Sequence, residues 1–287
     1  MGMNTQNNAR VAHGNHGGHA VEGEASLKSA PVSNRGGAGS SPASRSYREL
    51  SILFNGDMVR VILEGRKTQT RRPVRFPDSG SFVLVEQGDG SLWPYRSDNG
   101  ESAICDDGCE HPLASPFGKP GDRLYVRETW ADTNGACGPM VSYRAGGDRF
   151  LMEDYEPGEA CDYSRYPGGN FTQWCGDLRR GEPGHRWRPS IHMPKWAARI
   201  WLEVKNVRVE RLQSITKEDA VSEGFQEWYV SLDLSPYGVE SADVYELPKP
   251  VDQFAVAWDS LYGSKGLGWS GNPYVWVCDF EVAEVKA

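Results

Sequence analysis

The sequence contains no run of 18 consecutive apolar residues, and its N-terminal part has no apolar stretch that could serve as a secretory signal peptide. Cysteine is sparse, with six residues scattered through a chain of 287. Exported proteins that depend on disulfides use cysteines far more densely, so we expect these thiols to be reduced. Together these absences predict no membrane contact and a cytoplasmic location.

Several catalytic motifs are also missing. The chain has no glycine-rich phosphate loop, no G-x-S-x-G segment and no H-E-x-x-H segment, which argues against the enzyme classes built on them. Positive charge is in deficit as well, because 31 basic residues stand against 39 acidic ones, for a net charge of −8. Binding to nucleic acid over the whole surface is therefore not expected, since it uses many phosphate contacts. A local basic patch remains compatible with this balance.

What the chain has in abundance is glycine, proline, tryptophan and tyrosine, which favour strands and turns over a helical bundle. Residues 1–48 have almost no large apolar side chains and are expected to be a disordered tail. We expect residues 49–287 to form one domain. Within it, about 77–117 and 132–186 are rich in Gly, Pro and Asp and are predicted to be two long loop insertions.

Hydrophobic periodicity and capping residues predict the remaining elements. A short strand at 52–54 precedes a helix that Asn55 caps and Gly65 ends, and a strand follows at 124–129. A long half-buried strand begins at residue 200, and a short helix follows with Thr216 and Asp219 as a capping box. A helix over 251–262 and a closing strand complete the chain. This order predicts an α+β fold, with a small mixed β-barrel and flanking helices.

The segment EGRKTQTRRPVRF concentrates positive charge directly after the first predicted helix. Its cations are Arg66, Lys67, Arg71, Arg72 and Arg75. Carbonyl groups at the end of a helix attract positive charge, which is a purely structural explanation for Arg66 and Lys67. The alternative is that the segment forms one wall of a ligand pocket, with Lys67 and Arg72 facing the ligand and Arg66 and Arg75 facing water.

The segments GRKTQTRR, PGDRLYVRETW, RVERLQSITKEDAVSEG and VWVCDF, in this order, resemble the ASCH superfamily of PUA-like β-barrels. The segments PSIHMPKWAARI and NPYVWV make the chain similar to the larger ASCH proteins of phages and prophages. The resemblance covers about residues 50–287. It implies a link to RNA and nucleoside chemistry. We predict no cofactor and no metal. Fold alone does not determine function, so the site residues must carry that part of the prediction.

Small bacterial ASCH amidohydrolases, which release acetate from N4-acetylcytidine, provide the implied site. Their catalytic lysine and threonine match Lys67 and Thr70, and their catalytic glutamate matches Glu223. Thr70 would supply a hydroxyl nucleophile and Lys67 its base, while Glu223 would protonate the leaving nitrogen. We also predict substrate-binding roles for Arg66, Arg71 and Arg72, whose guanidinium groups can hold a carbonyl or a phosphate.

Four further positions have a functional and a structural interpretation. Glu128 is a second acidic candidate, but an ion pair with an arginine explains it equally well. Trp130 could stack on a base, as could Tyr125. His192 could contact substrate, with a purely structural histidine as the alternative. Finally, the C-x3-C-x-H arrangement of Cys105, Cys109 and His111 would need a fourth ligand to hold zinc, such as Cys137, Cys161 or Cys175.

Three functions follow as hypotheses. The first is an enzyme that cleaves an N-acyl group from a modified nucleoside or nucleotide, with a nuclease as a variant. The second is a module that binds single-stranded RNA or DNA without turnover. The third is a phage accessory or morphogenesis protein that acts through protein contacts. The sequence predicts no oligomeric state.

Overall fold

The computed structural model describes residues 47–75, 81–136, 138–152, 162–226, 229–231, 244–246 and 249–286. Residues 1–46 of the expected tail lie outside this range. Arg48, which was assigned to the tail, is an ordered part of the domain and pairs with Asp122 at 3.0 Å. Among the described residues, no helix is long and apolar enough to cross a membrane.

A five-stranded sheet forms the centre of the molecule, in the order β1-β5-β10-β13-β2. Its members are β1 (Glu49–Leu53), β2 (Gln69–Pro73), β5 (Arg123–Arg127), β10 (Ile200–Arg211) and β13 (Tyr274–Val285). Only β1 and β5 are parallel, and the other three pairings are antiparallel. Register shifts in the long β10–β13 ladder bend the sheet. In the described chain no ladder joins β1 to β2, so the sheet is open where a closed barrel was expected.

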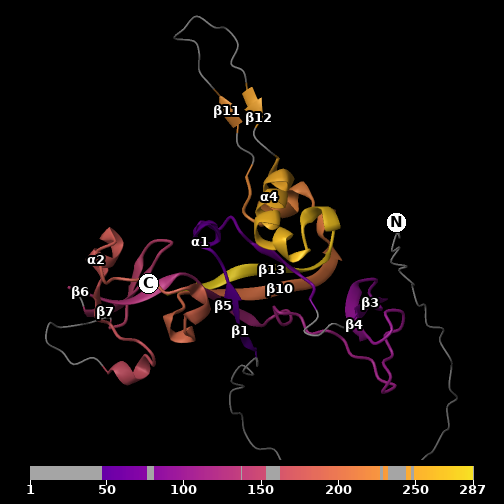
Figure 1. The fold of residues 1–287 in the computed structure, drawn as a ribbon, viewed down its shortest axis with the longest axis horizontal. Helices are drawn as coiled ribbons and strands as arrows, with labels where there is room; N and C mark the ends of the chain where they lie inside the picture. Colours follow the sequence, from indigo (N-terminus) through magenta and orange to yellow (C-terminus); the bar gives the residue numbers. More distant parts are fainter. Residues whose placement is uncertain are drawn as a thin grey trace, which may run out of the picture.

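Each face of the sheet carries its own core, because side chains alternate along a strand. On β13, Trp276, Cys278 and Phe280 belong to a core that includes α1 (Gly56–Leu63). The intervening Val275 and Val277 pack instead with α3 (Lys217–Ser222) and α4 (Pro250–Tyr262). Figure 1 shows α4 lying over β13 and β10. The mixed α+β class predicted from the sequence is therefore confirmed.

The two stretches expected as loop insertions contain regular structure. The first holds the hairpin of β3 (Ser81–Glu86) and β4 (Leu92–Ser97), which packs on the sheet through Trp93 and Trp276, with ring centroids 4.9 Å apart. The second contributes to a sheet ordered β8-β7-β6-β9. Its elements are β6 (Trp130–Gly135), β7 (Gly138–Tyr143), β8 (Asp148–Phe150), β9 (Gln173–Trp174) and α2 (Cys175–Arg180).

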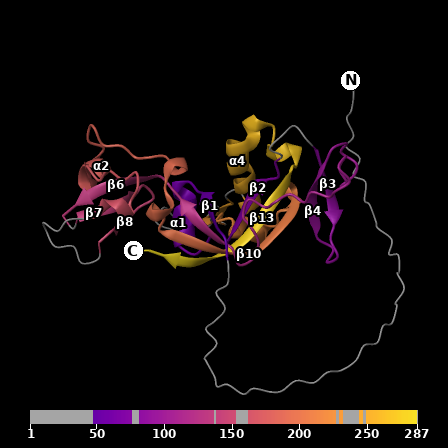
Figure 2. The same ribbon diagram turned by 90° about the horizontal axis from the view of Figure 1, so that it is seen from below.

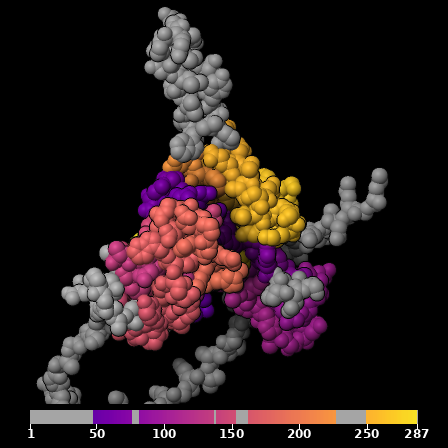
Figure 3. Space-filling model, turned by 60° about the vertical axis from the view of Figure 1, so that its left-hand side comes forward, coloured from indigo at the N-terminus to yellow at the C-terminus, as the bar shows by residue number. Residues whose placement is uncertain are grey.

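These two additions lie at opposite ends of the central sheet in the views of Figures 1 and 2. Figure 3 shows them as separate lobes, with α4 above. The strands β11 (Tyr229–Ser231) and β12 (Val244–Glu246) form a further hairpin. The described residues also form short 3-10 helices: η1 (Tyr163–Arg165), η2 (Ser190–His192), η3 (Lys195–Ala197), η4 (Leu212–Ser214), η6 (Gly263–Lys265) and η7 (Trp269–Gly271).

Candidate functional site

The link between α1 and β2 positions Lys67. Helix α1 begins at the predicted cap, where Asn55 accepts from the amide of Met58 at 2.8 Å, and it is followed by Gly65 with φ of +72°. The next amides fold back on the helix, and that of Lys67 donates to the carbonyl of Val61 at 3.1 Å. The amide of Thr68 then donates to the carbonyl of Ser222 in α3, at 2.8 Å. This last contact brings Lys67 to the end of α3.

Glu223 is the C-cap residue of α3. The predicted capping box is present, since the Thr216 hydroxyl accepts from the Asp219 amide at 3.1 Å and the Asp219 carboxylate accepts from the Thr216 amide at 3.2 Å. The chain turns away at Gly224 with φ of +104°, and a Cβ there would lie 2.9 Å from a methyl of Val61. Glycine is therefore required at the point that directs Glu223 inward.

Lys67 and Glu223 form a buried ion pair although 156 positions separate them. Nζ of Lys67 lies 2.5 Å from Oε2 of Glu223, 2.8 Å from the carbonyl oxygen of Gln69 and 2.9 Å from the carbonyl oxygen of Glu223. Lys67 is 1% exposed and Glu223 6%. An ammonium group has three N–H donors, so all of them are used here.

Burial lowers the pKa of Lys67 below its usual 10.5. The carboxylate of Glu223 acts in the opposite direction, and the positive charges of Arg72 and Arg71 add to the lowering. Desolvation disfavours the charged form of an amine, and nearby cations do the same. The Lys67 amine can therefore lose its proton more readily than an exposed lysine.

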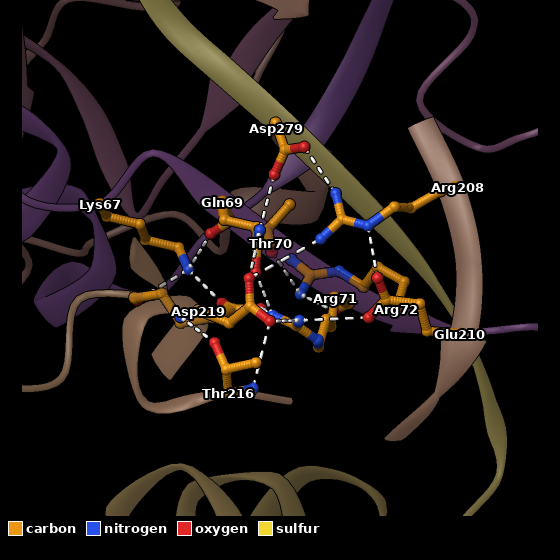
Figure 4. Close-up of polar contacts among 11 residues, drawn as sticks. Lys67, Gln69, Thr70, Arg71, Arg72, Arg208, Glu210, Thr216, Asp219 and Asp279 are labelled. Carbon is orange, nitrogen blue, oxygen red and sulfur yellow. Dashed lines mark hydrogen bonds and ion pairs between the residues drawn. The ribbon is translucent and has the colours of Figure 1, made fainter. Parts of the chain in front are cut away.

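Arg71 extends from the same strand into a network of polar side chains beneath α3. Its guanidinium lies 3.1 Å from Asp219, 3.5 Å from Glu210 and 3.6 Å from Glu223. Figure 4 shows the labelled members converging from β2, β10, α3 and β13. We call these side chains the Arg71 network: Gln69, Arg71, Arg208, Glu210, Asp219 and Asp279.

Two members of the network show how tightly its charges are coupled. Asp279 accepts from Gln69 and from Arg208, both at 2.6 Å. Burial alone would raise the pKa of Asp219, but the Thr216 amide, Gln69 and the two arginines outweigh burial and lower it. Asp219 is therefore held as a carboxylate.

Thr70 and Arg72 occupy the other face of β2, because alternate residues of a strand point to opposite sides. Thr70 is fully buried, and its hydroxyl accepts from Nη1 of Arg72 at 3.3 Å. Nη2 of Arg72 donates to the carbonyl of Leu53 at 2.9 Å, which bridges β2 and β1, the two edges of the open sheet. Arg72 also lies over the ring of Phe54, 5.5 Å from its centre. In the described chain, no carboxylate forms an ion pair with Arg72.

A thiol faces Thr70 from the neighbouring strand. Cys278 is paired with Thr70 in the β2–β13 ladder and is completely buried. Burial, with the nearby carboxylates of Asp279 and Glu223, raises the pKa of the Cys278 thiol to about 12. A thiol in this state is not a nucleophile near neutral pH, which leaves the hydroxyl of Thr70 as the candidate nucleophile.

A cavity of about 470 Å³ opens beside Arg72. It lies between β1, β2, the loop that follows β4, and the end of α4. Its lining is Ser51, Ile52, Leu53, Arg72, Pro73, Arg75, Leu113, Ala114, Pro116, Phe117, Tyr262, Lys265 and Trp276. Lys67, Thr70 and Glu223 do not line it. Arg72 does line it, and its Nη1 contacts the Thr70 hydroxyl at 3.3 Å. Arg75 was expected to face water; it is exposed, as expected, but also forms part of this wall.

Glu128, Trp130 and His192 lie apart from this group. Glu128 is 1% exposed and accepts from Arg199 at 2.8 and 3.0 Å, which is the ion pair given as its alternative. Burial raises the pKa of Glu128, although Arg199 acts in the opposite direction. Trp130 is 1% exposed and packs edge-on against Trp196, so it offers no free face for a base. His192 is exposed in η2.

The remaining candidates also have local partners. Arg66 pairs with Glu64 and donates to the carbonyl of Gly224 at 3.3 Å, consistent with a role at the helix end. His111 bonds to Asp107 at 2.8 Å, and Cys105 is buried while Cys109 is exposed. Within the described ranges, no three His, Cys, Asp or Glu side chains are grouped so as to hold a metal ion. Cys137 and Cys161, named as possible fourth ligands, lie outside those ranges.

Comparison with known proteins gives no independent identification. No family model matches the chain, and neither a curated protein nor a solved structure matches it. The ASCH resemblance and the phage association therefore stay predictions that depend on the quoted motifs.

Sequence reasoning missed two groups of residues. The first group is the Arg71 network, of which only Arg71 was predicted as a site residue. Its members come from β2, β10, α3 and β13, which are distant in the sequence. The second comprises Tyr262 and Lys265 at the cavity. Because successive side chains of a strand point to opposite faces of the sheet, the segment QTRR already indicates that Gln69 and Arg71 share one face and Thr70 and Arg72 the other. No local signal indicates which carboxylates or aromatics each pair meets.

Proposed function

We propose that this protein hydrolyses an N-acyl group on a modified nucleoside or nucleotide, with Lys67, Thr70 and Glu223 as the reacting side chains. The observation that carries the proposal is the buried contact of Lys67 with Glu223 at 2.5 Å, beside the strand that holds Thr70. We further propose that the curled sheet is a PUA-like, ASCH-type barrel. The Arg72 bridge between its two edges supports that assignment.

The first half of the reaction forms an acyl-threonine. Lys67 passes a proton to Glu223 within the ion pair, which yields a neutral amine and a carboxylic acid. The amine then takes the proton of the Thr70 hydroxyl while the Thr70 oxygen attacks the carbonyl carbon of the acyl group. The carbon–nitrogen bond breaks, and Glu223 gives its proton to the leaving nitrogen. Arg72 moves from Thr70 to donate to the carbonyl oxygen, on which negative charge develops.

The second half releases the acid. Glu223, now a carboxylate, takes a proton from water, whose oxygen attacks the ester carbonyl. The bond between the acyl carbon and Thr70 breaks, and Lys67 returns its proton to the threonine oxygen. The carboxylic acid leaves and passes its proton to solvent. A proton moves back from Glu223 to Lys67, which restores the ion pair.

A panel of N4-acylated cytidines, offered free and within RNA, tests this proposal by the release of cytidine. We expect turnover by the full chain and a loss of at least about a hundredfold in kcat/KM for Thr70→Val. Thr133→Val is the matched control, since Thr133 is also fully buried and its hydroxyl is hydrogen-bonded, at 2.8 Å from the hydroxyl of Ser142. Both residues belong to the β6–β7 sheet, away from Thr70. Absence of turnover on every member of the panel would overturn the proposal.

A second candidate is binding of a nucleotide or single-stranded RNA without turnover. It is favoured by the fully used donors of Lys67, which resemble a structural ion pair, and by the cations at the cavity. Binding that persists in Thr70→Val, combined with no release of acyl groups, would establish this alternative.

A further inference from the structure

The charged residues that line the cavity beside Arg72 are all positive. Three of its lining residues are cationic, namely Arg72, Arg75 and Lys265, and none of the described residues that line it is acidic. None of these three forms an ion pair with a carboxylate in the described part of the chain. The chain as a whole carries a net charge of −8, so this local excess is opposite in sign to the molecule. A concave site lined by one sign of charge attracts a ligand of the other sign.

Two of the cations share one aromatic neighbour. Arg75, just beyond β2, lies 5.8 Å from the ring centre of Tyr262, and Lys265, in η6, lies 5.5 Å from it. Tyr262 is the last residue of α4, so these charges come from two segments far apart in the sequence. The wall also includes Phe117 and Trp276. An apolar and aromatic wall with a few charged groups is typical of a small-ligand site.

The size of the cavity limits the ligand. Its volume of about 470 Å³ lies within the range that small-molecule sites occupy and is too small for a folded nucleic acid. A phosphate group fits the chemistry, because arginine and lysine bind phosphate oxygens through charged hydrogen bonds. Arg72 also lines the cavity, and its Nη1 contacts Thr70 at 3.3 Å.

We propose that this cavity binds the phosphate of a mononucleotide through Arg75 and Lys265, with the base directed toward Arg72 and Thr70. The orientation of the base rests on the proposed function, while the phosphate contact does not. The substrate class is then an acylated nucleoside monophosphate in preference to a free nucleoside.

Calorimetric titration of the full chain with cytidine 5′-monophosphate, cytidine and inorganic phosphate tests this assignment. We expect the monophosphate to bind at least about tenfold more tightly than either of the other probes, since hydrogen bonds to charged groups are among the strong ones. Arg75→Gln and Lys265→Gln should each weaken monophosphate binding about tenfold and leave cytidine binding unchanged. Added salt should weaken monophosphate binding more than cytidine binding.

Two variants serve as matched controls, because each also removes a cation that lies over an aromatic ring. Arg123 is 4.7 Å from the ring centre of Tyr47, and Lys286 is 5.4 Å from that of Trp201. Neither lines the cavity. Arg123→Gln and Lys286→Gln should leave monophosphate binding within about twofold of the unchanged protein.

Several results would overturn the assignment: equal affinity for monophosphate and cytidine, no binding of either, inorganic phosphate as tight as the monophosphate, or control variants as weak as the cavity variants. Binding of an RNA tetranucleotide more than about tenfold tighter than the monophosphate would assign the site to a strand instead. Turnover is measured on the same preparations. Turnover without a phosphate preference removes only this inference, and a phosphate preference without turnover removes only the proposed hydrolysis.

Discussion

The two faces of β2 differ in how their arginines are compensated. Arg71 is buried on one face among the carboxylates of Glu210, Asp219 and Glu223, at 3.1 to 3.6 Å. Arg72, the next residue, contacts a hydroxyl and two backbone carbonyl groups. It also borders a cavity, and none of the described residues that line this cavity is acidic. Adjacent residues of one type therefore occupy opposite electrostatic surroundings.

The difference indicates separate roles for the two faces. A buried ion pair that loses one partner is strongly destabilising, because the remaining charge is left buried and uncompensated. The Arg71 face therefore holds β2, β10 and α3 in one arrangement, and it also positions Glu223 beside Lys67. An arginine without a carboxylate partner is free to bind an incoming anion or carbonyl group. The Arg72 face is the one that is suited to a ligand.

The largest expected effect comes from removing each arginine in turn. Arg71→Met leaves Asp219 and its neighbours without their main cation and should lower the free energy of unfolding by about 3–5 kcal/mol. Arg72→Met removes hydrogen bonds to neutral oxygens and should cost about 1 kcal/mol. Urea denaturation of both variants measures the difference. Equal costs for the two, within about 0.5 kcal/mol, would show that the faces are not distinct.

A smaller effect concerns the turn that places Glu223. Gly224→Ala combines a positive φ with a contact of 2.9 Å to Val61, and it should cost about 2–4 kcal/mol. Gly65→Ala is the matched control, since Gly65 also has a positive φ but nothing lies within 4 Å of the added methyl. It should cost about 1 kcal/mol. If the two glycines prove equally sensitive, the close approach at Gly224 does not constrain Glu223.

Local patterns predicted those parts of the fold that depend on local physics. The Asn55 cap and the Thr216–Asp219 capping box are hydrogen bonds between residues three apart, so a short window of sequence contains the whole signal. The long strand β10 was predicted in the same way, from its alternation. In contrast, all six residues of β7 are buried, so the strand has no period of two, which explains why it was assigned to a loop.

At the candidate site, prediction from the sequence is limited by contacts between residues that are far apart in the chain. The contact of Lys67 with Glu223 was predicted only through the ASCH resemblance, because no local rule relates residues 156 positions apart. Arg75 is exposed as expected, but nothing near it in sequence indicates its contact with Tyr262. For Glu128 both interpretations were open, and the buried contacts with Arg199 favour the structural one.

The smallest expected effect concerns one proton, and it separates the reactive from the structural interpretation of Lys67. Because burial lowers the pKa of Lys67, its side chain should titrate in the folded protein below 10.5, the value of an unperturbed lysine. Above the folded pKa the unfolded chain binds the extra proton, so the contribution of Lys67 to the free energy of unfolding rises with pH up to 10.5. Carbon NMR of protein labelled at the lysine side chains detects this early-titrating resonance, and Lys67→Arg should remove it. A Lys67 resonance that titrates at or above 10.5 would mean that the ion pair with Glu223 outweighs burial, and Lys67 could not then serve as the base for Thr70.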